Sequence, residues 1–469
     1  MRLEMYIVCQ VIAYSLWITS ADAEVRYVKP TASGTGDCGS WANACTLPVG
    51  LSLAQSGDEL WCKSGTYAGI TLKDAVKIIG GFAGTETSSS QSNPSTNVTI
   101  VDGGGIGRCV YSADHTAATM FRGFKIISGF DGDDHGGGGL YMSDSSAMIV
   151  QCTFEDNTAS YLGGAVVVYA VGGPNYSPQF VNCVFRNNGS TATDDWPYEG
   201  GAVFIQGGIV TFTNCLFHGN NAGGGGAIAK VPGSYGILTN CTFANNQATL
   251  VRGGAIRDES GDILLRNCIL WGNTRLEGIP PTPILDQIHS PGYDAQVQYS
   301  DVDGGWPGTG NINADPHFQN SATDNYELQS TSPCKNTGDS DALPADLGDL
   351  DWDGNPAEPI PIDLARYTRV GLGTVDMGAY EFGCHTASPD CNLNGVPDWC
   401  EIEADPTLDC TNQNGILDLC ETNPSIPRGA CCIGSTCNWP TTSCQCTAGG
   451  GEWHQGKKCF QVTCGIPTE

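Results

Sequence analysis

Residues 151–273 decide the fold, because one short phrase recurs there with small variations. It reads QCTFEDN from Gln151, NCVFRNN from Asn182, NCLFHGN from Asn214, NCTFANN from Asn240 and NCILWGN from Asn267. A second phrase alternates with it, as GGAV at Gly163 and Gly200 and as GGAI at Gly225 and Gly253. The steps between successive anchors are 31, 32, 26 and 27 residues, measured at Phe154, Phe185, Phe217, Phe243 and Leu270. A period in this range, with connections of variable length, indicates a solenoid of stacked coils.

The pattern inside one phrase favours a strand. In the second copy, Val181, Cys183 and Phe185 alternate with Asn182, Val184 and Arg186, which is a period of two. One coil is too small to bury an apolar face alone, so it must stack on its neighbours. The Cys and Phe positions should then form inward columns at the strand spacing of about 4.8 Å. A leucine-rich horseshoe has a similar period, but its Leu spacing is absent. We therefore predict a parallel β-helix.

Each phrase ends on an Asn, at Asn157, Asn188, Asn220, Asn246 and Asn273. Asn tolerates left-handed backbone, and its amide can bond to the next coil. The two motifs together, GGA[ILV] and FxxN, resemble the repeats of the polymorphic outer-membrane proteins. This resemblance implies an all-β, right-handed parallel β-helix of the pectin-lyase-like class. It leaves the activity open, because that fold carries both adhesins and polysaccharide-cleaving enzymes.

The N-terminus and the charge indicate a secreted protein. Residues 1–23 read as a signal peptide, with Arg2 before an apolar run at 6–18 and a small-residue cleavage site ending at Ala23. No later apolar run approaches the roughly 20 residues of a membrane helix, so we expect no transmembrane segment in the mature chain. The net charge of −29 argues against nucleic acid and anionic membrane surfaces as partners.

The chain divides into six predicted segments. They are the signal peptide (1–23), an N-terminal cap with the first strands (24–84), the β-helix coils (85–314), a last coil with a C-terminal cap (315–383), a calcium-loop module (384–424) and a Cys-rich module (425–469). The cap assignment rests on DPHF at Asp315 and VDMGAYEF at Val375, which resemble the closing region of many secreted bacterial β-helix proteins.

The run DLDWDGNPAE in the same region also begins like a calcium loop. Asp349, Asp351, Asp353 and Gly354 fit the start of such a loop, but its later acidic ligand is missing from the expected place. We therefore expect a turn in which the Asp side chains cap backbone groups.

The 23 cysteines fall into two populations. One occupies a single position of the coil, where in-register stacking holds the Cβ atoms too far apart for relaxed disulfides, so buried free thiols are expected at Cys152, Cys183, Cys215, Cys241 and Cys268. Cys38, Cys45 and Cys62 could staple the N-terminal cap. The other population is dense after Cys384 and indicates a disulfide framework formed in an oxidising compartment.

The segment DCNLNGVPDWCE matches the 12-residue calcium loop, in which hard oxygens occupy alternate positions and a carboxylate closes the site. The predicted ligands of Ca²⁺ are Asp390, Asn392, Asn394, Val396 through its carbonyl, Asp398 and Glu401. A second copy keeps Asn412, Asn414, Ile416, Asp418 and Glu421, but its first position holds Cys410, which leaves its occupancy open. The pair resembles dockerin modules and thrombospondin type 3 repeats, and the dockerin resemblance implies docking to a partner protein.

Long acidic corners give the candidate ligand site. Asp131, Asp133 and Asp134 should lie about two coils, or roughly 10 Å, from a second acidic corner, with Tyr161 between them. That second corner contains Asp194, Asp195, Trp196, Tyr198 and Glu199. Carboxylates beside aromatic rings suit sugar binding, a paired-carboxylate glycosidase or a calcium site. The simplest alternative is that the acidic loop tips only keep the surface soluble.

Three functions are consistent with the sequence. We favour a secreted or cell-surface module that binds a glycan or a surface partner and is stabilised by Ca²⁺ at its C-terminus. The alternative is a polysaccharide lyase or glycoside hydrolase, in which Asp194, Asp195 and Glu199 are the candidate catalytic carboxylates. The catalytic sets of β-helix polygalacturonases and pectate lyases are absent from the sequence, so binding is preferred over catalysis. The third function is that of a structural component of a surface layer.

Overall fold

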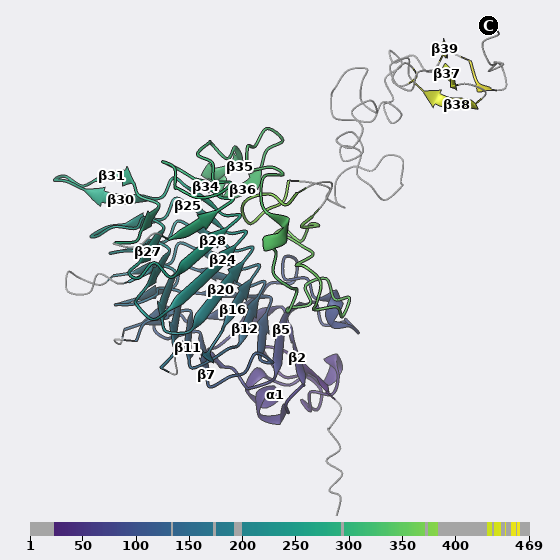
Figure 1. Ribbon diagram of the computed structural model, residues 1–469. Helices are drawn as coiled ribbons and strands as arrows, with labels where there is room; N and C mark the ends of the chain where they lie inside the picture. Colours follow the sequence, from purple (N-terminus) through teal and green to yellow (C-terminus); the bar gives the residue numbers. More distant parts are fainter. Residues whose placement is uncertain are drawn as a thin grey trace, which may run out of the picture.

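The computed structural model describes residues 23–132, 135–171, 175–191, 199–291, 295–370, 374–382, 429–433, 436–441, 446, 452–455 and 457–459. Most of them form a parallel β-helix in which each complete coil contributes one strand to each of four sheets (Figure 1). The fold predicted from the repeats is therefore confirmed. The four sheets are named A to D in the order in which a coil passes through sheets A, B, D and C.

The first residue of each phrase lies between the strand of sheet A and the strand of sheet B. In the described residues, sheet A contains β1 (Val25–Val28), β2 (Glu59–Lys63), β5 (Lys77–Phe82), β8 (Met120–Arg122), β12 (Met148–Val150), β16 (Gln179–Val181), β20 (Ile209–Thr213), β24 (Tyr235–Thr239), β28 (Ile263–Arg266) and β33 (Gln296–Gln298). Sheet B contains β3 (Gly65–Tyr67), β6 (Thr99–Asp102), β9 (Phe124–Ile127), β13 (Thr153–Glu155), β17 (Val184–Arg186), β21 (Leu216–His218), β25 (Thr242–Ala244), β29 (Ile269–Trp271) and β34 (Asp301–Val302).

Sheets D and C complete each coil. Within the described residues, sheet D contains β10 (Phe130–Asp131), β14 (Thr158–Ala159), β18 (Gly189–Ser190), β22 (Asn221–Ala222), β26 (Gln247–Ala248), β30 (Thr274–Glu277) and β31 (Thr282–Leu285), the last pair being antiparallel. Sheet C contains β4 (Ile70–Thr71), β7 (Val110–Ala113), β11 (Leu140–Ser143), β15 (Val166–Tyr169), β19 (Val203–Gln206), β23 (Ile228–Lys230), β27 (Ile256–Asp258) and β32 (Ile288–His289).

The anchor residues form the core in the predicted register. Phe154, Phe185, Phe217 and Phe243 pair from strand to strand in sheet B, and all four are fully buried. Their rings stack nearly parallel, with centroids 5.0, 4.6 and 4.6 Å apart, which adds aromatic contact to the burial of apolar surface. The neighbouring cysteine column is also buried and free of disulfides, as predicted, at Cys152, Cys183, Cys215, Cys241 and Cys268.

The terminal asparagines form a continuous ladder inside the solenoid. Each Nδ2 donates to the Oδ1 of the next Asn at 2.8 to 3.0 Å, along Asn157, Asn188, Asn220, Asn246 and Asn273. Each Nδ2 also donates to a carbonyl of the preceding coil, as Asn220 does to Phe185 at 2.9 Å. The predicted bond to the next coil is thus present. The left-handed backbone lies one residue earlier, for example at Asn187, where φ is 55°.

Short elements close both ends of the core. The helix α1 (Leu47–Leu53) lies at the first coil, and Leu51 packs against the core. A Cβ on Gly50 would lie 3.1 Å from the Val28 side chain, which shows how closely this helix approaches. Cys38 and Cys45 form the staple of this cap, while Cys62 is a buried free thiol. At the last coil Trp306 packs against the core and donates its indole N–H to the Ala295 carbonyl at 3.2 Å.

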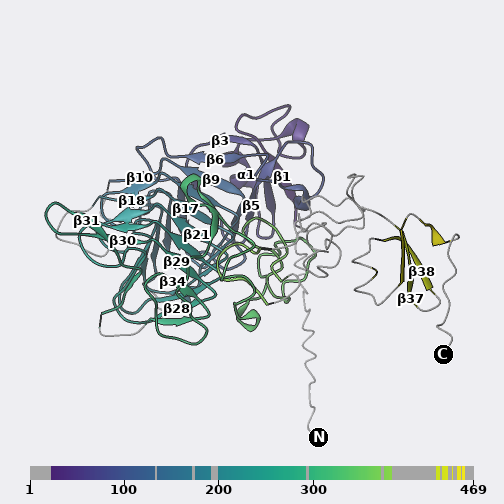
Figure 2. The same cartoon turned by 90° about the horizontal axis from the view of Figure 1, so that it is seen from above.

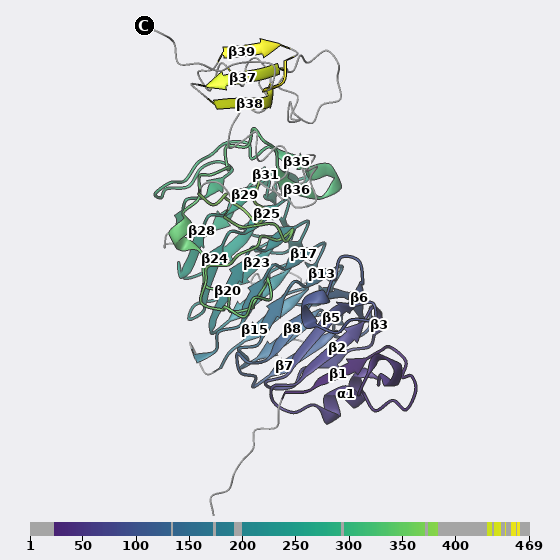
Figure 3. The ribbon, with the colours of Figure 1, turned by 90° about the vertical axis from the view of Figure 1, so that its right-hand side faces the viewer.

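The described residues 338–370 and 374–382, here called the strap, leave the last coils and run back along the flank of the stack (Figures 1 and 3). The strap follows the hairpin of β35 (Phe318–Asn320) and β36 (Asn325–Leu328) and includes the 3₁₀ helix η5 (Ser340–Ala342). This path differs from a cap over the last coil, which we expected from the sequence. The first Asn of each phrase holds it, since the amides of Asn267, Asn240 and Asn214 donate to the carbonyls of Asp339, Asp376 and Ile362 at 2.9 Å each.

The strap reaches the early coil that contains β8. There the guanidinium of Arg122 is buried, donates to the carbonyls of Asp349 and Leu350 at 3.1 and 3.0 Å, and stacks over the Trp352 ring. Figure 2 shows the same green segment beside β5 and β17. Leu350 and Ile360 pack on the outer face of sheet A, so apolar contact and hydrogen bonds both fix the strap to the solenoid.

A buried charged cluster holds the end of the strap together. Arg369 is fully buried and donates to the carbonyls of Asp376 and Gly378 at 3.0 and 2.7 Å. Its Nε lies 3.6 Å from Glu381, and the Asp363 carboxylate accepts the backbone N–H of Glu381 at 2.8 Å. Burial raises the pKa of Asp363 and of Asp376 to about 6 and that of Glu381 to about 9.

The described part of the Cys-rich module is a small antiparallel sheet. Its strands are β37 (Gly429–Ile433), β38 (Thr436–Thr441) and β39 (Glu452–Gln455), with β37 in the middle. Disulfides join Cys431 to Cys446 and Cys437 to Cys459, so this part of the predicted disulfide framework is present. Among the helices in the described residues, none has the length and apolar character needed to cross a lipid bilayer.

Candidate binding groove

The acidic corner predicted from the sequence is described only in part. Asp133, Asp134, Asp194, Asp195, Trp196 and Tyr198 lie outside the described residues. The same holds for every predicted calcium ligand, from Asp390, Asn392, Asn394, Val396, Asp398 and Glu401 to Asn412, Asn414, Ile416, Asp418 and Glu421. Tyr161 is described and is 38% exposed at its corner.

Asp131 and Glu199 are both buried and both hold the corner together. The Asp131 carboxylate lies 2.8 Å from Arg108 Nη2 and accepts the backbone N–H of Gly136 at 2.7 Å. Glu199 accepts the Ser190 hydroxyl at 2.8 Å and the Gly223 N–H at 2.6 Å, and burial raises its pKa. Asp131 stands in one column with Ser190, two coils apart, as the stacking requires. These contacts give both carboxylates a structural task.

A groove lies elsewhere, on the outer face of sheet B. Two adjoining hollows of about 330 and 350 Å³ share six lining residues, namely Pro94, Ser95, Gln151, Thr153, Val184 and Tyr380. We call the residues lining these two hollows the sheet B groove. Its floor follows from the period of two, because Thr153, Val184 and Leu216 point outward where the neighbouring Phe residues point inward.

Segments far apart in the chain form the two sides of the groove. Pro94, Ser95 and Val98 line it from the connection between β5 and β6. Leu364, Arg366 and Tyr380 line it from the strap. The groove therefore depends on the path by which the strap returns along the stack.

Charged groups lie in and beside the groove: Lys125 and Arg186 line it, and Glu155 stands in one outward row with Arg186. Glu155 Oε2 lies 2.6 Å from Lys125 Nζ and 2.7 Å from Arg186 Nη2. Burial alone would raise the pKa of Glu155, but the hydrogen bonds from Arg186 and Lys125 outweigh it, so this pKa lies below its usual value and Glu155 is ionised at neutral pH. The side chains of Lys125 and Arg186 stay about one-third exposed, at 32% and 33%, so both can also reach a ligand.

The next residue in this outward row is His218. Its Nδ1 lies 3.5 Å from Asp324 Oδ1, and its side chain is only 4% exposed. Burial lowers the pKa of His218, so the imidazole is neutral at pH 7. The groove thus offers ammonium and guanidinium donors and the half-buried Tyr380, whereas the imidazole of His218 is almost wholly covered. In the described residues, the carboxylates close enough to share a metal ion lie in the strap, at Asp346, Asp349 and Asp351, and not in the groove.

Sequence reasoning missed the groove, although one signal for it was available. Glu155, Arg186 and His218 each follow an anchor Phe directly, so the repeats already place them in one outward row. The residues of the opposite side, such as Arg366 and Tyr380, come from a segment outside the repeats, and no period relates them to the coils.

Comparison with known proteins agrees with the architecture. Residues 62–228 and 195–282 match the family described as right handed beta helix region, in line with the right-handed winding of the solenoid. One curated relative, the metabotropic glutamate receptor-like protein R of Dictyostelium discoideum, is 26% identical over 203 residues, which cover 38% of this chain and 12% of that protein. The chain thus spans only a small part of that relative's length.

Two solved structures match the chain at low similarity. The crystal structure of pectate lyase Pel9A has 13% sequence identity and a TM-score of 0.40, covering 77% of this chain and 97% of that one. A rhamnogalacturonan lyase has 13% identity and a TM-score of 0.30, covering 64% of this chain and 91% of that one. Both similarities are distant, and neither bears on activity.

Proposed function

We propose that the protein is a secreted or cell-surface module that binds an extended glycan chain in the sheet B groove. The observation that carries this proposal is the groove itself. Its floor crosses the successive strands β9, β13, β17 and β21, so it offers similar contacts at each step of about 4.8 Å along the stack. A polymer of repeating units can use such a surface better than a compact ligand can.

The lining chemistry supports a sugar ligand. Lys125, Arg186 and Arg366 present charged donors that suit hydroxyl and carboxylate oxygens, and guanidinium groups can bind a carboxylate through two hydrogen bonds. Thr153 and Val184 give the floor a partly exposed strip against which the carbon face of a sugar ring can lie. Glu155 balances part of the positive charge and fixes the two donors in place.

The remaining features fit a protein that works outside the cell. The disulfides Cys38–Cys45, Cys431–Cys446 and Cys437–Cys459 suit an oxidising compartment, as does the signal peptide expected at residues 1–23. We retain Ca²⁺ on the loops that begin at Asp390 and Cys410 as part of this proposal, with the role of stabilising the C-terminal module.

The test is a glycan array with the full mature chain, followed by titration with the best-binding glycan. Thr153→Trp fills the floor of the groove, and Thr274→Trp on the outer face of sheet D is the matched control. We expect at least a tenfold loss of affinity in T153W and no change in T274W. Equal affinity of the two variants, or no glycan bound by the parent chain, would refute the groove assignment.

The same glycans also test for catalysis. Each one is incubated with the parent chain and assayed for new reducing ends and for the ultraviolet absorbance of unsaturated sugar products. A binding module leaves all of them intact. Cleavage that T153W abolishes would instead make the groove the active site of a polysaccharide-cleaving enzyme, which is the alternative function considered from the sequence.

A further inference from the structure

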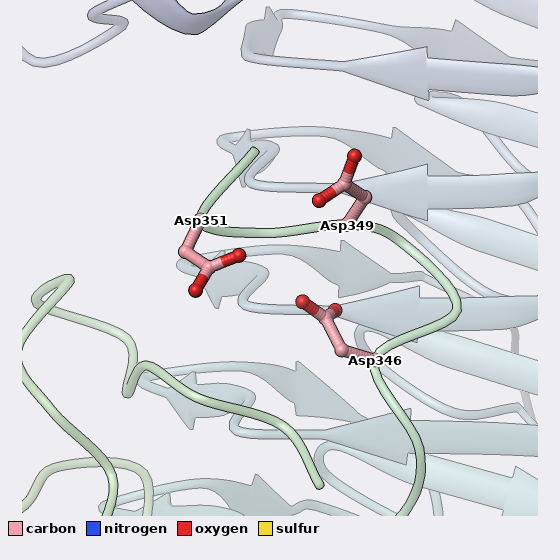
Figure 4. Close-up of side chains that lie close together, drawn as sticks. All are labelled: Asp346, Asp349 and Asp351. Atoms are coloured by element: carbon pink, nitrogen blue, oxygen red, sulfur yellow. The ribbon is translucent and has the colours of Figure 1, made fainter. Parts of the chain in front are cut away.

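Three carboxylates of the strap meet beside the outer face of sheet A. Asp346, Asp349 and Asp351 each offer an oxygen that lies within 4.8 Å of the other two (Figure 4). The figure shows each carboxylate with an oxygen turned toward the space between them. Asp351, Asp353 and Glu358 form a second set with the same spacing, and Asp351 belongs to both.

Asp346 provides independent evidence for a ligand in the space between these carboxylates. Only 1% of its surface is exposed. Its Oδ2 accepts the backbone N–H of Leu350 at 2.7 Å, while its Oδ1 is buried without a hydrogen-bond partner. A buried carboxylate oxygen without a partner is costly, so native structures satisfy such atoms with a donor or a cation.

The second set shows the same deficiency. Glu358 Oε1 is also a buried oxygen without a partner, and its Oε2 has only a long contact of 3.5 Å from the Asn355 amide. Arg122, whose charge acts on Asp346, is already engaged. Its Nε donates to Gln151, and its other nitrogens donate to the carbonyls of Gly348, Asp349 and Leu350. Arg122 therefore fixes the backbone of the loop and leaves the carboxylates unsatisfied.

We propose that Asp346, Asp349 and Asp351 bind one Ca²⁺ ion, with Asp353 and Glu358 adding negative charge on its far side. All of these groups are hard oxygen donors, and the described cluster contains no His or Cys, which excludes the softer donor sets typical of zinc or copper. Ca²⁺ accepts six to eight oxygens in variable geometry, so it suits three carboxylates on an irregular loop better than Mg²⁺ does. This site is separate from the loops predicted at residues 390–421.

Binding at this position would fasten the strap to the solenoid. The backbone of residues 348–350 is held by Arg122 of β8, and Leu350 packs in the cluster that includes Met148 and Val150 of β12. A cation that joins Asp346 to Asp351 ties the two ends of this short loop together. The inference does not depend on the proposed glycan, because the site lies on sheet A and outside the sheet B groove.

The experiment measures Ca²⁺ binding and thermal stability on the full mature chain. Glu401→Gln and Glu421→Gln remove the terminal carboxylate from each of the two predicted C-terminal loops and provide the background. After treatment with EDTA, this background should bind one further Ca²⁺ in titration calorimetry. We expect an affinity in the range of extracellular modules, about 0.1–1 mM, and a melting temperature that rises with CaCl₂.

Two variants and a control identify the site. Asp351→Asn should weaken Ca²⁺ binding at least tenfold. Asp346→Asn can keep the bond to the Leu350 N–H, so it should fold, melt above the background in EDTA and lose the rise with CaCl₂. Asp341→Asn, an exposed strap residue outside the cluster, should behave like the background. No binding by the background, or an unchanged CaCl₂ response in both D346N and D351N, would overturn the proposal.

Discussion

The asparagine ladder gives the sharpest stability prediction, and Asn220→Ala tests it. The side chain of Asn220 is fully buried and makes four hydrogen bonds. Its Nδ2 donates to Phe185 O and to Asn246 Oδ1, both at 2.9 Å, and its Oδ1 accepts the backbone N–H and the Nδ2 of Asn188, both at 3.0 Å.

The cost follows from which partners the substitution leaves unsatisfied. Asn188 Nδ2 keeps its bond to Phe154 O, and Asn246 Oδ1 keeps the backbone N–H of residue 220. The N–H of Asn188 and the carbonyl of Phe185 lose their contacts with the amide. The Phe185 carbonyl also lies in the parallel ladder with β21, so the Asn188 N–H is the group left without a partner, and N220A should lower the free energy of unfolding by about 1–3 kcal/mol.

The adjacent residue offers a matched control. Asn221 is exposed, and its amide makes one long contact of 3.4 Å to Gln247 Oε1. Asn221→Ala should therefore change the free energy of unfolding by less than about 0.5 kcal/mol. The assay is urea denaturation followed by circular dichroism, with hydrogen exchange of the Asn188 amide as a local readout. If N220A and N221A have equal stability and equal exchange at residue 188, the ladder does not hold the coils together.

Three further predictions concern charge, thiols and the N-terminal cap. The pKa values of Asp363, Asp376 and Glu381, about 6, 6 and 9, lie above the values near 4 of unfolded chains. The stability that these groups contribute is therefore fully present below about pH 4 and is lost as the pH rises through 6 and 9. The melting temperature should fall between pH 5 and 9.5, and it should fall less steeply in Glu381→Gln. A thiol reagent should not label the buried cysteine column from Cys152 to Cys268 in the native chain and should label it fully after denaturation, as measured by peptide mass spectrometry. Labelling in the native state would contradict the packing. Replacing Cys38 and Cys45 by Ser should lower the free energy of unfolding by about 2.5 kcal/mol in urea, as expected for a short closed loop, and an unchanged midpoint would show that the bridge is dispensable.

The repeats predicted the core well because each inward position recurs. Phe154 and Phe185 carry the same alternation, so their pairing follows from the period alone. The bond of Asn220 to the next coil could be foreseen for the same reason, since an amide has both a donor and an acceptor for a ladder. The left-handed backbone was expected at the ladder Asn itself, but it occurs one residue earlier, at Asn187, because the turn begins before the ladder residue.

The course of the strap could not be predicted from the sequence. The amide of Asn214 donates to the backbone carbonyl of Ile362, and Arg122 donates to that of Leu350. Every residue has a backbone carbonyl, so the partner sequence carries no mark of these contacts. The groove shares this difficulty, because Arg366 and Tyr380 reach it only through the strap. The acidic Asp349 turn was foreseen as a set of backbone caps, and Gly354 N–H does donate to Asp349 at 3.1 Å. The proximity of this turn to the buried Asp346 depends on tertiary structure.

The measurement that tests the central claim most directly is hydrogen–deuterium exchange of the full mature chain with and without the best-binding glycan from the array. If a glycan chain lies in the sheet B groove, exchange should slow in β13, β17 and residues 364–366 together, and the corner at Asp131 and Tyr161 should not change. Protection at that acidic corner without protection of β13 and β17 would contradict the claim.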